Sequence, residues 1–369
     1  MQIGRERTDG PYRWPASLRL PPRPPTLVYL DMLHWIALAK AHTGHPDGRR
    51  HEETLAALVN AQASGTAVFP ISDSIFFETS QIGQHRQRRD LRDVIELLSK
   101  YFVVTSRSVI SAHEIEALLD DLVGPSSRPI NAMDYLDWGV ARAFGMAGGF
   151  RIYDEHGADV TEDARLAHPG GPDEFDRLHR SAELELVRNV LAGPAPDEEA
   201  QMRSLGWRPG NESDVGTKRA EQEREQQSRF KADPRWRRGR IRDLVAAREV
   251  VIEANRILTE AVNDRAANLA ELFPTPEHAR AAFDSMPSFD VAVTLKVAYH
   301  EDLNHRWTPN DIHDIDALGS SVPYCDVVVT DKAVASQLRR TGLDERLETL
   351  VLTSLDELPE LLSGPTHRG

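Results

Sequence analysis

Cysteine is nearly absent from this sequence, in which Cys325 is the single representative. One thiol excludes an intramolecular disulfide framework and a thiolate-rich zinc site. Long apolar runs are also missing, and none approaches the roughly 20 residues that cross a bilayer. The first residues contain no apolar segment of the kind found in a secretory signal peptide. We therefore expect a cytoplasmic protein with no membrane contact, in which any metal ion is bound by oxygen ligands.

Basic residues are outnumbered, because 44 Lys and Arg stand against 58 Asp and Glu and leave a formal net charge of −14. This balance argues against a protein that coats nucleic acid by charge alone. The length of 369 residues suits two units, or one domain with a large insertion. The places where carboxylates gather are therefore more informative than their number.

Short apolar runs alternate with amphipathic stretches in two separate blocks of the chain, 26–122 and 288–363. In the first block the pattern predicts strands near 27–30, 66–72 and 102–105, with helices between and after them. In the second block it predicts strands near 326–331 and 350–352. Strands that alternate with helices indicate an α/β fold, with a central parallel sheet between two helical layers.

The rest of the chain differs in character. Residues 1–25 end in LPPRPP and are expected to form a proline-rich N-terminal arm. Residues 123–287 predict a mainly helical insertion with a small hairpin turning at Gly157. Within the insertion, the polar stretch 195–234 contains EQEREQQ and is expected to be partly flexible, because it has few residues that build a core.

Four acidic residues are placed where a parallel sheet binds ligands. Asp31 and Asp331 directly follow strand-like runs, and ligands of open parallel sheets bind beyond the carboxyl ends of the strands. Glu78 lies one turn into the helix after the second run, and Asp314 lies in the helix before the run that ends at Asp331. Four close anions raise one another's pKa values unless a cation neutralises them. Carboxylate oxygens are ligands for Mg²⁺ or Mn²⁺.

Three segments resemble the PIN (PilT N-terminus) domain of metal-dependent ribonucleases. They are VYLDMLHWIALAKA, VFPISDSIFFETSQI and NDIHDIDALGSSVPYCDVVVTDKAVASQL, within blocks that cover a little under half of the chain. The resemblance implies that Asp31, Glu78, Asp314 and Asp331 are catalytic residues and ligands of Mg²⁺ or Mn²⁺. Thr330 fits the Thr-Asp pair of the family. The implied architecture is a split PIN-like domain, 26–122 and 288–363, around an insertion that a minimal PIN domain does not have.

The identity of the third acid stays open, because Asp311, Asp314 and Asp316 share one stretch. Asp311 and Asp314 lie on one helical face and Asp316 points elsewhere, and the spacing to Thr330 favours Asp314 with Asp311 as the alternative. His34 is close enough in sequence to Asp31 to contact a phosphate or a water on the metal. The alternative for His34 is a packed histidine beside Trp35.

Two arginine clusters stand against the overall charge and are candidates for nucleic-acid binding. The first follows Glu78 and contains Arg86, Arg88 and Arg89. The second contains Arg235, Trp236, Arg237, Arg238 and Arg240. Arginine contacts phosphate bidentately and tryptophan stacks on bases, which suits single-stranded RNA. The alternative is an exposed helix start whose arginines pair with neighbouring acids.

The first hypothesis is a PIN-like endoribonuclease that hydrolyses RNA, with the insertion available for substrate recognition or for a protein partner or inhibitor. In the family such nucleases act as toxins or in RNA processing, and the fold also includes DNA nucleases. A second hypothesis is a catalytically silent PIN-like module that binds RNA or protein. A third is a magnesium phosphohydrolase that acts on small phosphoesters.

Overall fold

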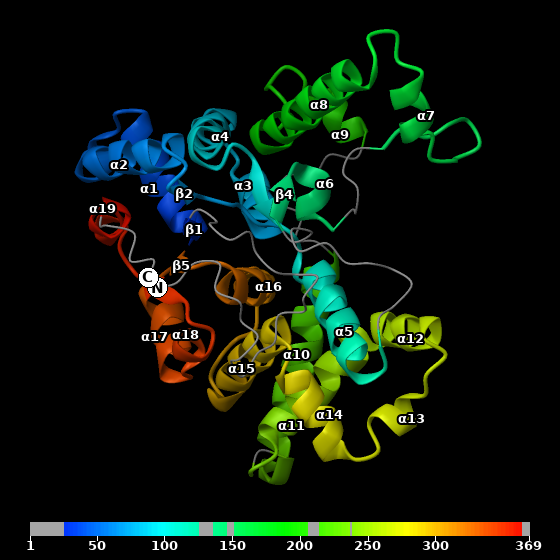
Figure 1. The fold of residues 1–369 in the computed structure, drawn as a ribbon. Helices are drawn as coiled ribbons and strands as arrows, with labels where there is room; N and C mark the ends of the chain where they lie inside the picture. Colours follow the sequence, from blue (N-terminus) through cyan, green and yellow to red (C-terminus); the bar gives the residue numbers. More distant parts are fainter. Residues whose placement is uncertain (1–25, 125–135, 146–150, 206–213, 237, 364–369) are drawn as a thin grey trace.

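The computed structural model describes residues 26–124, 136–145, 151–205, 214–236 and 238–363 (Figure 1). The predicted N-terminal arm, 1–25, lies outside the described residues. The described part is mostly helical and contains a small parallel sheet, a combination that agrees with the α/β class. None of its helices is long and apolar enough to cross a membrane.

The main sheet has the strand order β2-β1-β5-β6, and all of its pairings are parallel. Its strands are β1 (Thr26–Leu30), β2 (Ala67–Val68), β5 (Val327–Val329) and β6 (Leu350–Leu352). The strands β1 and β5 are neighbours although some 300 residues separate them, with Val28 opposite Val327. The two predicted blocks of the chain therefore meet in the centre of one sheet.

The third predicted strand is placed differently from the prediction. Strand β3 (Phe102–Val104) pairs antiparallel with β4 (Leu136–Trp138), a strand that the sequence pattern did not indicate. A single parallel bridge between Ile71 and Val103 connects β3 to the chain that continues from β2. The parallel sheet is thus narrower than expected, and an antiparallel pair lies beyond its β2 edge.

Helices of both blocks pack around the main sheet. The first block supplies α1 (Met32–His42), the 3₁₀ helix η2 (Pro46–His51), α2 (Glu52–Ala63), α3 (Asp73–Gln81), α4 (His85–Ser99) and α5 (Arg107–Leu122). The second block supplies α15 (Pro287–Glu301), α16 (Pro309–Tyr324), α17 (Lys332–Arg340), α18 (Leu343–Arg346), η5 (Leu355–Glu357) and α19 (Leu358–Ser363). Alternate residues of β1 belong to two cores, because Val28 packs with Trp35 of α1 and Tyr29 packs with Leu295 of α15.

Apart from β4, the described chain between the two blocks is mainly helical. It contains α6 (Val140–Ala143), α7 (Thr161–Leu166), α8 (Pro172–Ala192), α9 (Glu199–Ser204), α10 (Asp214–Ala232), η3 (Pro234–Trp236), α11 (Ile241–Glu249), the π-helix η4 (Val250–Ala254), α12 (Asn255–Asp264), α13 (Leu269–Leu272) and α14 (Pro276–Asp284). The predicted hairpin is reduced to one antiparallel bridge between Tyr153 and Asp159, with Gly157 at a φ of 80°.

The expectation of a partly flexible stretch at 195–234 is wrong for α10. This helix packs against α16, and its Phe230 is buried. Its Glu223 is also buried, and this carboxylate pairs with Lys296 at 3.0 Å and with His300 at 2.9 Å. Buried charges of this kind are stable only when they are paired. Ion pairs therefore help to hold helix α10 against its neighbours. The expectation of flexibility was based on the low number of apolar residues, which does not take such ion pairs into account.

Candidate functional site

Two of the predicted acids lie side by side at the carboxyl edge of the sheet. Asp31 ends β1 and caps α1, where its Oδ1 accepts a hydrogen bond from the Met32 amide at 2.7 Å. Asp331 follows β5 and caps α17, where its Oδ1 accepts from the Ala333 amide at 2.6 Å. The Thr330 hydroxyl donates to Asp31 Oδ2 at 3.0 Å and joins the two strand ends. Because β1 and β5 are neighbours, the sheet itself brings both carboxylates together.

Glu78 and Asp314 approach the same edge from helices α3 and α16. Burial, with added repulsion from Asp31 and then Asp314, raises the pKa of Glu78 to about 8. Burial, with added repulsion from Asp31, Asp311 and Asp331, raises the pKa of Asp314 to about 7. Carboxyl groups with raised pKa values beside other carboxylates are a mark of a site that lacks a counter-charge. The structure thus brings all four acids into one electrostatic field.

The other two candidates for the third acid have different partners. Asp311 forms a capping box with Thr308 at the start of α16, with a 2.6 Å hydrogen bond from the Thr308 amide, and lies 3.4 Å from His305. Asp316 faces away from the site and pairs with Arg107 and Arg219. Burial alone would raise the pKa of Asp316. The two arginines nevertheless hold this pKa well below its usual range. Asp316 therefore lies apart from the cluster, whereas Asp311 still raises the pKa of Asp314, so the third acid is Asp314 with Asp311 as the alternative.

The four carboxylates suit a divalent cation by chemistry, because Mg²⁺ and Mn²⁺ prefer oxygen ligands. In the described ranges, however, no group of three or more His, Cys, Asp or Glu side chains is arranged to hold a metal ion. Asp31 and Asp331 instead each direct one oxygen to the backbone amides of a helix start. The four acids interact electrostatically, but in the described residues their oxygens are not arranged as a metal coordination shell.

Three further side chains surround the acids. The Tyr29 hydroxyl lies 2.9 Å from Ser72 Oγ, and burial together with Asp31 raises the tyrosine pKa. The pKa of Tyr299 is raised by burial and by Asp314, Asp311 and Asp331. His34 is buried, which lowers its pKa. Its Nε2 has no hydrogen-bond partner among the described residues. Its burial agrees with the alternative that His34 is a packed histidine beside Trp35. A contact of His34 with phosphate stays a prediction.

Both tyrosines were missed as neighbours of the acids. Tyr29 lies two residues before Asp31 on β1, and a tyrosine inside such a run already signals a hydroxyl near the strand end. No comparable signal exists for Tyr299, which reaches the acids through the packing of α15 on α16.

The first arginine cluster divides into buried and exposed members. Arg88 is buried, and it donates to the carbonyl oxygens of Ile82 at 2.6 Å and Ala192 at 2.9 Å. Its prediction as an RNA contact is wrong, because the guanidinium ties α4 to the end of α8. Arg86 and Arg89 are exposed on α4, and the Arg86 side chain lies 3.8 Å from Asp90.

The second cluster is exposed wherever the structure describes it. Arg238 and Arg240 are exposed, and Trp236 exposes half of its surface. Arg235 pairs with Asp233 at 2.8 Å, as the alternative interpretation expected for a solvated helix start. Arg237 lies outside the described residues. An exposed tryptophan among arginines is available to stack on a base.

Comparisons with models of known protein families, with curated proteins and with solved structures each give no match. The likeness to PIN domains therefore depends on the quoted segments and on the placement of Asp31, Glu78, Asp314 and Asp331.

Proposed function

We propose that the protein is a PIN-like, metal-dependent endoribonuclease. The observation that carries this proposal is the meeting of Asp31, Glu78, Asp314 and Asp331, from four separate segments, at the carboxyl edge of a parallel sheet. The finer architecture in the proposal is the three-layer PIN fold, with helices on both faces of that sheet.

The four carboxylates would hold Mg²⁺ or Mn²⁺. When bound, such an ion supplies positive charge for the phosphate oxygens and lowers the pKa of the attacking water. Asp31 and Asp331 are fixed by their hydrogen bonds to the backbone, so they provide the rigid side of the site. Glu78 and Asp314 hold protons near neutral pH without the ion and are ionised with it, which makes them its adjustable ligands.

RNA is the proposed substrate because the protein has exposed arginine and tryptophan side chains that are separate from the four carboxylates. Trp236, Arg238 and Arg240 supply stacking and phosphate contacts that an acidic pocket cannot provide. An enzyme for small phosphoesters has no need of such a surface.

The experiment is a nuclease assay on single- and double-stranded RNA and DNA, with and without Mn²⁺. We expect cleavage of RNA that depends on Mn²⁺ and falls by at least about a hundredfold in Asp314→Asn. The matched control is Asp243→Asn, which removes a half-exposed carboxylate paired with Arg280 at 2.9 Å. Equal cleavage by the wild type and Asp314→Asn would refute the assignment.

A specific observation favours the silent binding module as the second candidate. In the residues that the structure describes, no three potential ligands adopt a metal-binding arrangement. If that arrangement persists in solution, calorimetry will detect no binding of Mn²⁺, while the arginine surface will still bind RNA.

A further inference from the structure

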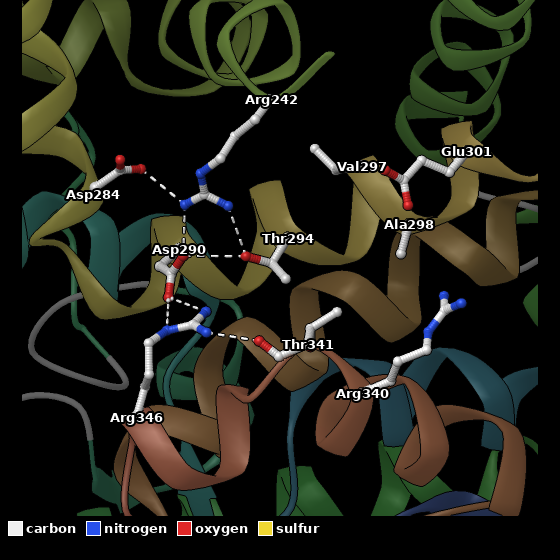
Figure 2. Close-up of a pocket in the computed structure, with 10 residues that line it drawn as sticks. All are labelled: Arg242, Asp284, Asp290, Thr294, Val297, Ala298, Glu301, Arg340, Thr341 and Arg346. Carbon is white, nitrogen blue, oxygen red and sulfur yellow. Dashed lines mark hydrogen bonds and ion pairs between the residues drawn. The ribbon is translucent and has the colours of Figure 1, made fainter. Parts of the chain in front are cut away.

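A pocket of about 620 Å³ opens between α11, α15, α17 and α18. Figure 2 shows three arginines at this pocket, Arg242 from α11, Arg340 from α17 and Arg346 from α18. Helix α17 connects the pocket to the acidic edge, because Asp331 caps its first turn and Arg340 is its last residue. At 1.5 Å per residue, the two ends of α17 lie roughly 13 Å apart.

A single buried carboxylate holds two of these arginines in place. Asp290 is almost fully buried, and it receives Arg242 Nη2 at 2.7 Å and Arg346 Nη2 at 2.9 Å (Figure 2). The Thr294 hydroxyl also accepts from Arg242 Nη1 at 2.9 Å. Both arginine side chains remain about one third exposed, at 37% and 36%. Their guanidinium groups are therefore preorganised at the pocket wall, with surface still open to a ligand.

Arg340 completes the arginine set from another wall. It is exposed, and its Nη2 donates to the neutral amide of Gln337 at 2.8 Å. The acids of the pocket lining are Asp284, Asp290 and Glu301, which balance the three arginines in formal charge. The lining is therefore formally neutral in a chain with a net charge of −14, so it repels a phosphate less than the acidic surface elsewhere does. Val297 and Ala298 add an apolar strip to the lining.

The pocket is also continuous in sequence with the exposed arginine cluster. Arg242 follows Arg238 and Arg240 at the start of α11. The exposed arginines at 238 and 240 are therefore close in sequence to Arg242 in the pocket. Helix α17 has Arg340 of the pocket at its end and Asp331 at its start. A planar guanidinium group recognises phosphate by two parallel hydrogen bonds, and three such groups line this pocket.

We propose that this pocket binds a backbone phosphate of an RNA strand whose scissile bond lies at the four carboxylates. The proposal rests on the nuclease function and adds a subsite for the flanking part of the strand. A free nucleotide carries the same phosphate chemistry, so the test must separate these two sources.

The test measures binding of a fluorescent single-stranded RNA oligonucleotide by anisotropy, with the wild-type protein in a metal chelator that prevents cleavage. We expect Arg340→Ala to weaken binding about tenfold and to lower the slope of log K against log salt by about 0.7, the value for one phosphate contact on a single strand. Arg340→Lys keeps the charge and should recover part of the affinity. Circular dichroism checks that each variant keeps its helices.

The matched control is Arg256→Ala, which removes an arginine that is 78% exposed on α12 and pairs with Glu260. An equal loss of affinity in Arg256→Ala and Arg340→Ala, or no loss in either, overturns the proposal. A mononucleotide that binds as tightly as the oligonucleotide, and loses affinity equally in Arg340→Ala, overturns the assignment to an RNA strand. Binding in chelator does not require a metal ion or cleavage, so a failure of the nuclease assay leaves this result separate.

Discussion

Uptake of a divalent cation by the four acids should release protons. With a pKa of about 8, Glu78 is roughly 90% protonated at pH 7. Asp314, with a pKa of about 7, is roughly half protonated. Carboxylates bind metal only when ionised, so binding at pH 7 should release about 1.4 protons per protein molecule.

Calorimetric titration with Mn²⁺, in two buffers of different ionisation enthalpy, measures this number. At pH 9 both groups are already ionised, and the release should fall to roughly 0.1 proton. Glu78→Gln removes the larger contribution and should leave about half a proton at pH 7, from Asp314. The matched control Glu360→Gln, on an exposed residue of α19, should leave the number unchanged. A release that is zero at pH 7, or the same at pH 7 and pH 9, refutes the reasoning.

Three further outcomes follow from the same contacts. Without metal, Glu78 and Asp314 bind protons more tightly in the folded state than in the unfolded state. The melting temperature should therefore fall as the pH rises from about 4 to 8, and Mn²⁺ should reduce that fall. Arg219→Met removes the bidentate partner of the part-buried Asp316, which keeps Arg107, and should lower the free energy of unfolding by about 1–3 kcal/mol in urea denaturation; an unchanged free energy of unfolding would contradict a structural role for this pair. Trp236→Ala should weaken binding of single-stranded RNA by about 1–3 kcal/mol of stacking energy in anisotropy measurements, and unchanged affinity would remove this residue from the RNA surface.

Local sequence signals predicted the centre of the fold and the acids at its edge. An apolar run that ends in an acid, as at Asp31 and Asp331, is short enough to be a buried strand and leaves the carboxylate beyond its end. A threonine followed by a proline is typical of a helix start, and the structure shows a capping box at Thr308, directly before Pro309 and α16. These features depend on residues close in the chain, so the sequence pattern contains them.

Features that depend on distant partners could not be predicted. The burial of α10 depends on Lys296 and His300, more than sixty residues away. Arg88 belongs to an arginine cluster whose sequence does not show which member faces the protein interior. Asp290 reads as an ordinary acid in α15, and only the fold brings arginines from two other helices to it.

The most direct measurement of the central claim is the anomalous scattering of Mn²⁺ in a crystal of the wild-type protein grown with that ion. The account predicts one or two peaks among Asp31, Glu78, Asp314 and Asp331, each within about 2.2 Å of carboxylate oxygens. Asp31 and Asp331 should keep their hydrogen bonds to the starts of α1 and α17, while Glu78 and Asp314 turn towards the ion. Peaks that lie only elsewhere, with these four side chains unmoved, would contradict the account.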